Sequence, residues 1–98
     1  MQKQDVLTTL KQNEPALRAR GVLHAALFGS LARGENHPGS DIDILVKIDP
    51  QAKIGLFEYV DITQYLDDLF QGRVDVANHD ALKPYVRPEA ERDAIYAF

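Results

Sequence analysis

Two short apolar stretches, residues 23–28 and 41–48, are separated by a segment that cannot continue either of them. The first stretch stops at Gly29-Ser30, and Asn36-His37-Pro38-Gly39 has the composition of a turn. Runs of this length that are bounded by turn residues and rich in apolar side chains favour β-strands. A third strand is predicted over residues 74–78. These stretches restrict the chain to folds built on a small sheet.

The remaining segments follow a helical pattern of apolar residues. Helices are predicted over residues 3–20, 31–35 and 56–70, and from Pro88 to the C-terminus. Pro15 either kinks the first helix or starts its second part, while Gly21 and Gly72 are candidate helix stops. The helical segment before residue 74 is long enough to connect parallel strands, whose N-terminal ends then lie together. We therefore expect one α/β domain over residues 1–98, with a small mixed sheet and flanking helices.

Paired carboxylates open the second apolar stretch, at Asp41 and Asp43. Alternate residues of a strand point to the same face, with Cβ atoms about 6 to 7 Å apart. Side chains at this spacing can converge on two metal ions about 3.5 to 4 Å apart, as used in phosphoryl chemistry. If the second and third strands are parallel, Asp75 falls beside them. The alternatives are a turn cap for Asp41 and solvent-facing strand positions for Asp43 and Asp75.

The Gly29-Ser30 turn is a candidate phosphate site. Glycine permits a sharp turn and a close approach of the backbone, while serine adds a hydroxyl to the available N–H groups. The alternative is an ordinary strand-to-helix turn in which Ser30 is the helix N-cap. Arg33 is either a bidentate phosphate ligand or a surface residue. Ser40 could bind phosphate or orient Asp41.

Composition excludes several classes of protein. A net charge of −4 gives no basic footprint for a nucleic-acid template, and the absence of cysteine excludes disulfides and thiolate metal sites. No apolar run reaches the length of a membrane span, and the first residues lack the apolar region of a signal peptide. His24, His37 and His79 lack zinc-like spacing, and neither a P-loop nor a calcium-loop pattern occurs. The simplest expectation is a soluble cytoplasmic protein.

The segment Leu27-Phe-Gly-Ser-Leu-Ala-Arg-Gly34, followed by Ser40-Asp-Ile-Asp-Ile-Leu-Val46, resembles the signature of polymerase-β-like nucleotidyltransferases. Within that superfamily the chain is most similar to minimal nucleotidyltransferase (MNT) domains. The resemblance implies transfer of AMP from ATP to a hydroxyl, assisted by one or two Mg²⁺ ions, for which Mn²⁺ can substitute. It implies metal-binding and catalytic roles for Asp41, Asp43 and Asp75, the last also a candidate general base. Gly29, Ser30, Arg33 and Ser40 would hold the nucleotide.

The resemblance also implies a partner. About 20 residues follow the predicted third strand, enough for one helix rather than a substrate domain, so another protein is expected to present the acceptor. MNT proteins typically accompany a HEPN-domain ribonuclease toxin and act as its antitoxin by adenylylating a tyrosine. Three alternatives remain open: an enzyme acting on a small molecule such as an antibiotic, a non-catalytic module that covers a toxin, and a regulator that binds ATP without turnover.

Overall fold

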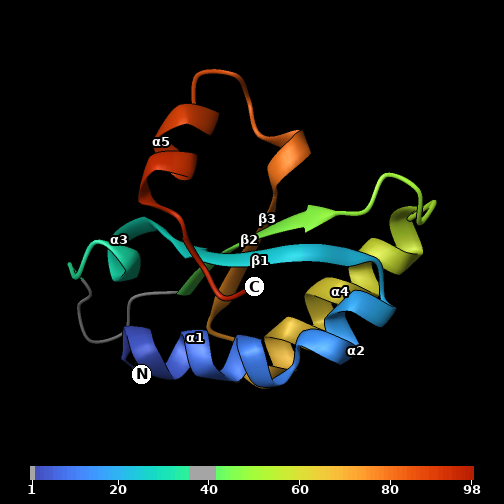
Figure 1. Cartoon of the computed structure of the whole chain (residues 1–98), viewed down its shortest axis with the longest axis horizontal. Coiled ribbons are helices and arrows are strands. Elements are labelled where there is room, and N and C mark those ends of the chain that lie inside the picture. Colours follow the sequence, from blue (N-terminus) through green and yellow to red (C-terminus); the bar gives the residue numbers. More distant parts are fainter. Residues whose placement is uncertain (1, 36–41) are drawn as a thin grey trace.

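The computed structural model describes residues 2–35 and 42–98 (Figure 1). Along the described chain the elements are α1 (Lys3–Gln12), α2 (Glu14–Ala19), β1 (Val22–Phe28), α3 (Gly29–Ala32), β2 (Ile42–Ile48), α4 (Leu56–Leu69), β3 (Val74–Asn78), the 3-10 helix η1 (His79–Ala81), α5 (Arg87–Asp93) and β4 (Ile95–Tyr96). No helix among these residues is long and apolar enough to cross a membrane.

The strands form one mixed sheet in the order β3-β2-β1-β4. Strands β2 and β3 are parallel, with α4 as their crossover, and β1 pairs antiparallel with both β2 and β4. The predicted mixed sheet and the predicted parallel pairing are both confirmed. The N-terminal ends of β2 and β3 therefore lie side by side, close to the point where β1 ends and α3 begins.

One face of the sheet carries the hydrophobic core. Helices α1, α2 and α4 cover this face, below the sheet in Figure 1. Alternate residues of β2 point into it, and Ile44 and Val46 are fully buried there against Ile62 and Leu66 of α4. Burying each such side chain stabilises the fold by about 1.5 to 3 kcal/mol. Because the pattern has period two, it also sends the intervening residues of β2 to the opposite face.

The opposite face of the sheet is covered by the segment that follows β3. Figure 1 shows η1 and α5 above the sheet, on the side away from α1 and α4. Ala26 and Leu45 occupy paired positions of β1 and β2 on this face and are buried, and Ala90 of α5 is 5% exposed. This layer also contacts α3, because Asp93 of α5 pairs with Arg33 at 2.9 Å.

Two of the predicted helices differ from the structure at their ends. The first divides at Asn13, and Pro15 lies in the first turn of α2, so it starts the second part rather than kinking a continuous helix. The short helix expected from residue 31 begins at Gly29. Gly21 ends α2 with a φ of +99°, a conformation that favours glycine, as predicted.

The prediction of a final helix reaching the C-terminus is wrong. Pro88 does lie in the first turn of α5, but Ala94 is extended and the chain continues as β4. Ile95, Ala97 and Phe98 pack against the core, and the Ala97 N–H donates to the Ala25 carbonyl at 2.9 Å. Packing against the core and pairing with β1 therefore stabilise the extended C-terminus more than a short terminal helix would, because the stability of a short helix by itself is marginal.

Candidate active site

Asp43 and Asp75 lie opposite one another on neighbouring parallel strands. They are register partners of the β2–β3 ladder, and Phe28 is the register partner of Asp43 on β1. Residues paired in this way share a face, and neighbouring strands are about 4.8 Å apart. Because the residues on either side of Asp43 face the core, this row of three lies on the opposite face. Asp43 is half-buried and Asp75 is exposed.

The Gly29 turn is in direct contact with this row. Gly29 has a φ of +77°, and a Cβ built on it would collide with the Asp43 carboxylate, lying 3.1 Å from its Cγ and 3.2 Å from its Cβ. From the sequence, Gly29 was predicted to let another group approach the backbone closely at this turn. In the structure, the group that lies close to Gly29 is the Asp43 carboxylate of β2, the strand paired with β1. The candidate phosphate turn and the candidate metal ligands therefore belong to one site.

Ser30 lies inside α3 rather than at its N-cap. The N-cap position is taken by Phe28, whose backbone is extended with φ −140° and ψ −176°. The alternative interpretation of Ser30 as N-cap is therefore wrong. The half-buried Ser30 instead follows directly after the glycine that touches Asp43.

Arg33 is held by two carboxylates. Its guanidinium forms an ion pair with Glu35 and donates through Nη1 to Asp93 of α5 at 2.9 Å. The hydrogen bond to Glu35, and then that to Asp93, raise the pKa of Arg33. Arg33 also lines a surface cavity of about 430 Å³ together with Phe28 and Gly29. These contacts use Nε and Nη1 of a group with five N–H donors, so a phosphate can bind the guanidinium beside the carboxylates or in place of one of them.

Two of the predicted site residues, Ser40 and Asp41, lie outside the described residues. Within residues 2–35 and 42–98, no group of three or more histidine and acidic side chains could hold a metal ion. Asp43 and Asp75 bring carboxylate oxygens to one place, and oxygen is the donor that Mg²⁺ prefers. The residues that are described thus fit a magnesium site, whose third carboxylate remains a prediction.

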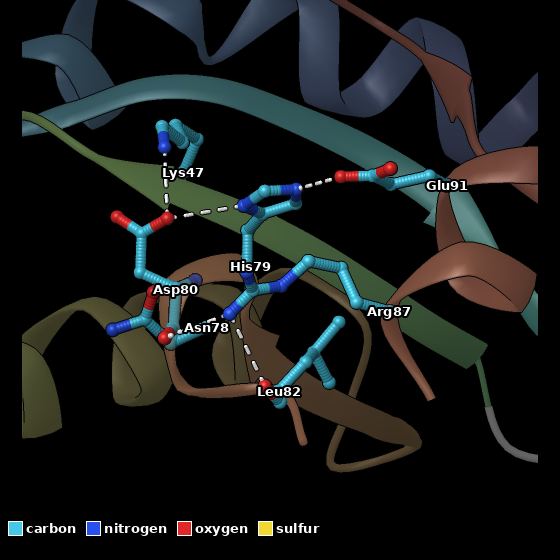
Figure 2. A network of polar contacts seen from close by, with 7 residues as sticks. All are labelled: Lys47, Asn78, His79, Asp80, Leu82, Arg87 and Glu91. Carbon is cyan, nitrogen blue, oxygen red and sulfur yellow. Dashed lines mark hydrogen bonds and ion pairs between the residues drawn. The ribbon is translucent and has the colours of Figure 1, made fainter. Parts of the chain in front are cut away.

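Another charged cluster lies at the opposite end of the β2–β3 pair (Figure 2). Lys47 donates to Asp80 at 2.8 Å, and His79 lies between Asp80, at 3.1 Å, and Glu91 of α5, at 2.6 Å. Lys47, and then His79, lower the pKa of the Asp80 carboxyl by hydrogen bonding. Arg87 donates to the backbone carbonyls of Asp80 and Leu82.

This cluster fastens η1 and α5 over the sheet. The structure places His79 in η1 and joins Asp80 to Lys47. Asp75 is the second residue of β3 and Asp80 lies two residues beyond the end of that strand, so the two carboxylates lie toward opposite ends of β3 although they are close in the sequence.

Comparison with known proteins identifies the class to which this site belongs. The family model described as "Nucleotidyltransferase domain" matches residues 4–97. The chain belongs to this family and is a nucleotidyltransferase. It is 40% identical over 72 residues to MJ1379 of Methanocaldococcus jannaschii, whose name proposes protein adenylyltransferase activity, with 72% of each chain covered. It is 32% identical over 94 residues to protein adenylyltransferase MntA of Thermococcus cleftensis, with 95% of this chain and 93% of that protein covered.

Solved structures identify the narrower group as minimal nucleotidyltransferases. One that is described by that name superposes with a TM-score of 0.72 at 30% identity, over 97% of this chain and 95% of the other. The same fold occurs in a toxin–antitoxin crystal structure with AMP-PNP (TM-score 0.69, 20% identity, 90% and 72% covered). It occurs again in a complex of an MNT antitoxin with a tri-AMPylated HEPN toxin of Shewanella oneidensis (TM-score 0.64, 16% identity, 94% and 71% covered).

Proposed function

We propose that this chain transfers AMP from ATP to a hydroxyl, most simply a tyrosine, of a HEPN-domain partner and thereby acts as its antitoxin. The observation that carries the proposal is the row formed by Asp43 and Asp75, against which the Gly29 turn packs. Nucleotidyl transfer requires carboxylates and phosphate-binding groups at one place, so the proximity of Gly29, Asp43 and Asp75, which come from three separate elements, supports the proposal.

The nucleotide is held through its phosphates by Gly29, Ser30, Arg33 and Ser40. Backbone N–H groups at the start of α3 and the Ser30 hydroxyl donate to phosphate oxygens. Arg33 exchanges a carboxylate for phosphate, a substitution that keeps its charge compensated. Because this guanidinium links α3 to α5, nucleotide binding should also loosen the contact between these helices.

Asp41, Asp43 and Asp75 would hold Mg²⁺, or Mn²⁺ in its place. Such an ion would supply neutralisation of phosphate charge and a lower pKa for an attacking hydroxyl. Asp75 is more exposed than Asp43 and lies on β3, an edge strand of the sheet, so a hydroxyl from another protein can reach it. It is therefore our candidate for the group that accepts the hydroxyl proton.

A protein acceptor is supported by the relatives. MntA of Thermococcus cleftensis is named a protein adenylyltransferase, and the Shewanella oneidensis complex contains a tri-AMPylated HEPN toxin beside its MNT antitoxin. An AMP group adds a bulky anion, which would repel RNA phosphate from a nuclease site on the partner. Inhibition then follows from the modification itself.

One measurement, the mass of the HEPN-domain protein after the reaction, distinguishes this function from two others. A nucleotidyltransferase for a small molecule would leave the HEPN protein unmodified, and a non-catalytic antitoxin would bind it without consuming ATP. The experiment is intact-mass spectrometry of the HEPN-domain protein after incubation with this chain, ATP and Mg²⁺. We expect one or more added AMP units, lost in Asp43→Asn.

The matched control is Asp80→Asn, which removes a carboxylate from the distant end of the same strand pair and should retain the transfer. Cells that express the toxin extend the test to the antitoxin role. If Asp43→Asn protects them as well as the unmodified chain does at the same expression level, inhibition by coverage replaces inhibition by AMP transfer.

A further inference from the structure

The first two turns of α4 expose large apolar side chains. Leu56 is 73% exposed, Phe57 is 86% exposed and Val60 is 51% exposed. All three are within five consecutive residues of one helix, so they form a single patch rather than scattered exposures. Contiguous exposed apolar groups on a soluble domain usually mark a surface that another molecule covers.

Beside this patch is a hollow between the end of α2 and the beginning of α4. Its volume is about 520 Å³, and its walls include Phe57 together with Gly21, Ala52 and Ile54. Beside Gly21 the wall is formed by Ile54, whose Cδ1 lies 2.7 Å from the position that a Gly21 Cβ would take, and the hollow opens next to Phe57. A side chain from a partner can therefore insert next to Phe57, which makes this a better docking feature than a flat surface.

The remaining exposed residues of α4 are Glu58, Asp61, Gln64 and Asp68, none of them a cation. Among the described residues, Glu58 and Asp68 form no ion pair with a lysine, arginine or histidine. Glu58, next to Phe57 in the sequence, thus adds to the patch one carboxylate that no described cation pairs with, whereas Asp68 lies in the last turn of α4.

The two arginines beside the hollow are already paired. Arg18 forms an ion pair with Glu14 at 2.7 Å, and Arg20 forms one with Asp61 at 3.2 Å and stacks on Tyr65 at 4.2 Å. The described charges around the hollow that form no ion pair are then the carboxylates of Asp49 and Glu58 and the ammonium of Lys53, which lies between Ala52 and Ile54, so one negative charge is in excess for a partner. A complementary surface has an apolar group at its centre and lysine or arginine side chains at its edge.

We propose that this surface, Leu56, Phe57, Val60 and the carboxylate of Glu58, docks the acceptor protein through an apolar contact edged by basic side chains. The inference rests on the proposed function, because it concerns the same partner. A second copy of this chain is a poorer occupant, since a twofold contact would place Glu58 and its neighbouring carboxylates opposite the same groups.

The position of the patch explains how docking and catalysis can coexist. Strand β2 begins at the end of the sheet that carries Asp43, whereas α4 begins at the other end, as Figure 1 shows. Helix α4 also covers the core face, while Asp43 and Asp75 lie on the opposite face. A partner bound to the patch leaves the candidate active site open to an acceptor side chain.

The test measures the affinity of the chain for the HEPN-domain protein by calorimetry at low and high salt, with Phe57→Ser and Glu58→Lys. We expect Phe57→Ser to weaken the complex at least tenfold. Glu58→Lys should weaken it mainly at low salt, where charge attraction is least screened. The control is Tyr85→Ser, because Tyr85 is another exposed aromatic residue, 74% exposed, and lies outside α4. It should leave the affinity unchanged.

Two further measurements distinguish a loss of partner binding from a loss of AMP transfer. ATP affinity should be equal in all variants, and AMP transfer by Phe57→Ser should recover when the partner is raised to saturation. Normal partner affinity in Phe57→Ser, together with intact AMP transfer, would overturn the docking site but not the proposed function. A concentration-dependent dimer that Phe57→Ser abolishes would assign the patch to a second copy instead.

Discussion

Replacing Gly29 with alanine should disable the site through one defined collision. The new Cβ meets the Asp43 carboxylate, which must move or rotate. The chain supplies a matched control in Gly34, which has the same φ of +77° but has no atom of the described residues within 4 Å of the position of a new Cβ. Both variants therefore experience the same backbone strain, and only Gly29→Ala displaces Asp43.

The expected loss of unfolding free energy has two contributions, the backbone strain of alanine at this φ and the displacement of Asp43. Alanine in the left-handed region costs about 1 to 2 kcal/mol, partly offset by about 0.4 to 1 kcal/mol from the stiffer unfolded chain. Gly34→Ala should therefore lose about 1 kcal/mol of unfolding free energy, or about 4 to 8 °C in melting temperature. In Gly29→Ala, an off-rotamer Asp43 adds about 0.5 to 1.5 kcal/mol.

The distinguishing assay is the rise in melting temperature on adding ATP with Mg²⁺. A ligand at 100 times its dissociation constant stabilises the folded state by about 2.7 kcal/mol. Gly34→Ala should retain this gain in full, whereas Gly29→Ala should lose most of it. If both variants are stabilised equally by ATP with Mg²⁺, the nucleotide does not depend on the geometry of Asp43 and the site is misassigned.

Three further outcomes follow from the structure. Asp75→Asn should abolish AMP transfer while leaving the melting temperature within about 2 °C, because this carboxylate is exposed; loss of folding would contradict its assignment. Asp93→Asn should strengthen ATP binding by about two- to fivefold in calorimetry, since Arg33 loses a competing carboxylate at an exposed site; weaker binding would show that this pair positions Arg33 for phosphate. Because the folded pKa of Asp80 is lowered from 3.8, its ion pair with Lys47 stabilises the fold above about pH 4 and less as the pH falls through the folded value. Asp80→Asn should therefore show a smaller loss of melting temperature on acidification.

Sequence patterns located the three strands because each is a compact apolar run with a turn at its end. The third was predicted over Val74–Asn78, the range that it has in the structure. Parallel pairing of the second and third strands followed from the length of the intervening helix, and that pairing alone brings Asp75 to Asp43. Local sequence pattern and chain connectivity were therefore sufficient to predict that Asp43 and Asp75 lie side by side.

The final strand could not be found in this way. Residues 95–98 form too short a run for strand periodicity to appear, and their conformation is decided by contact with the core and by pairing with β1. The ion pair of Arg33 with Asp93 could not be predicted either, because Asp93 is 60 residues away along the chain and meets Arg33 only when α5 folds over the sheet. Long-range contacts of this kind depend on the assembled tertiary structure rather than on local pattern.

The central claim is that the group transferred is AMP and that its acceptor is a protein. It is tested most directly by incubating this chain and the HEPN-domain protein with Mg²⁺ and ATP labelled on either the α- or the γ-phosphate. The α-label should become covalently attached to the HEPN-domain protein, while the γ-label should leave as pyrophosphate. Attachment of the γ-label, or of neither label, would contradict it.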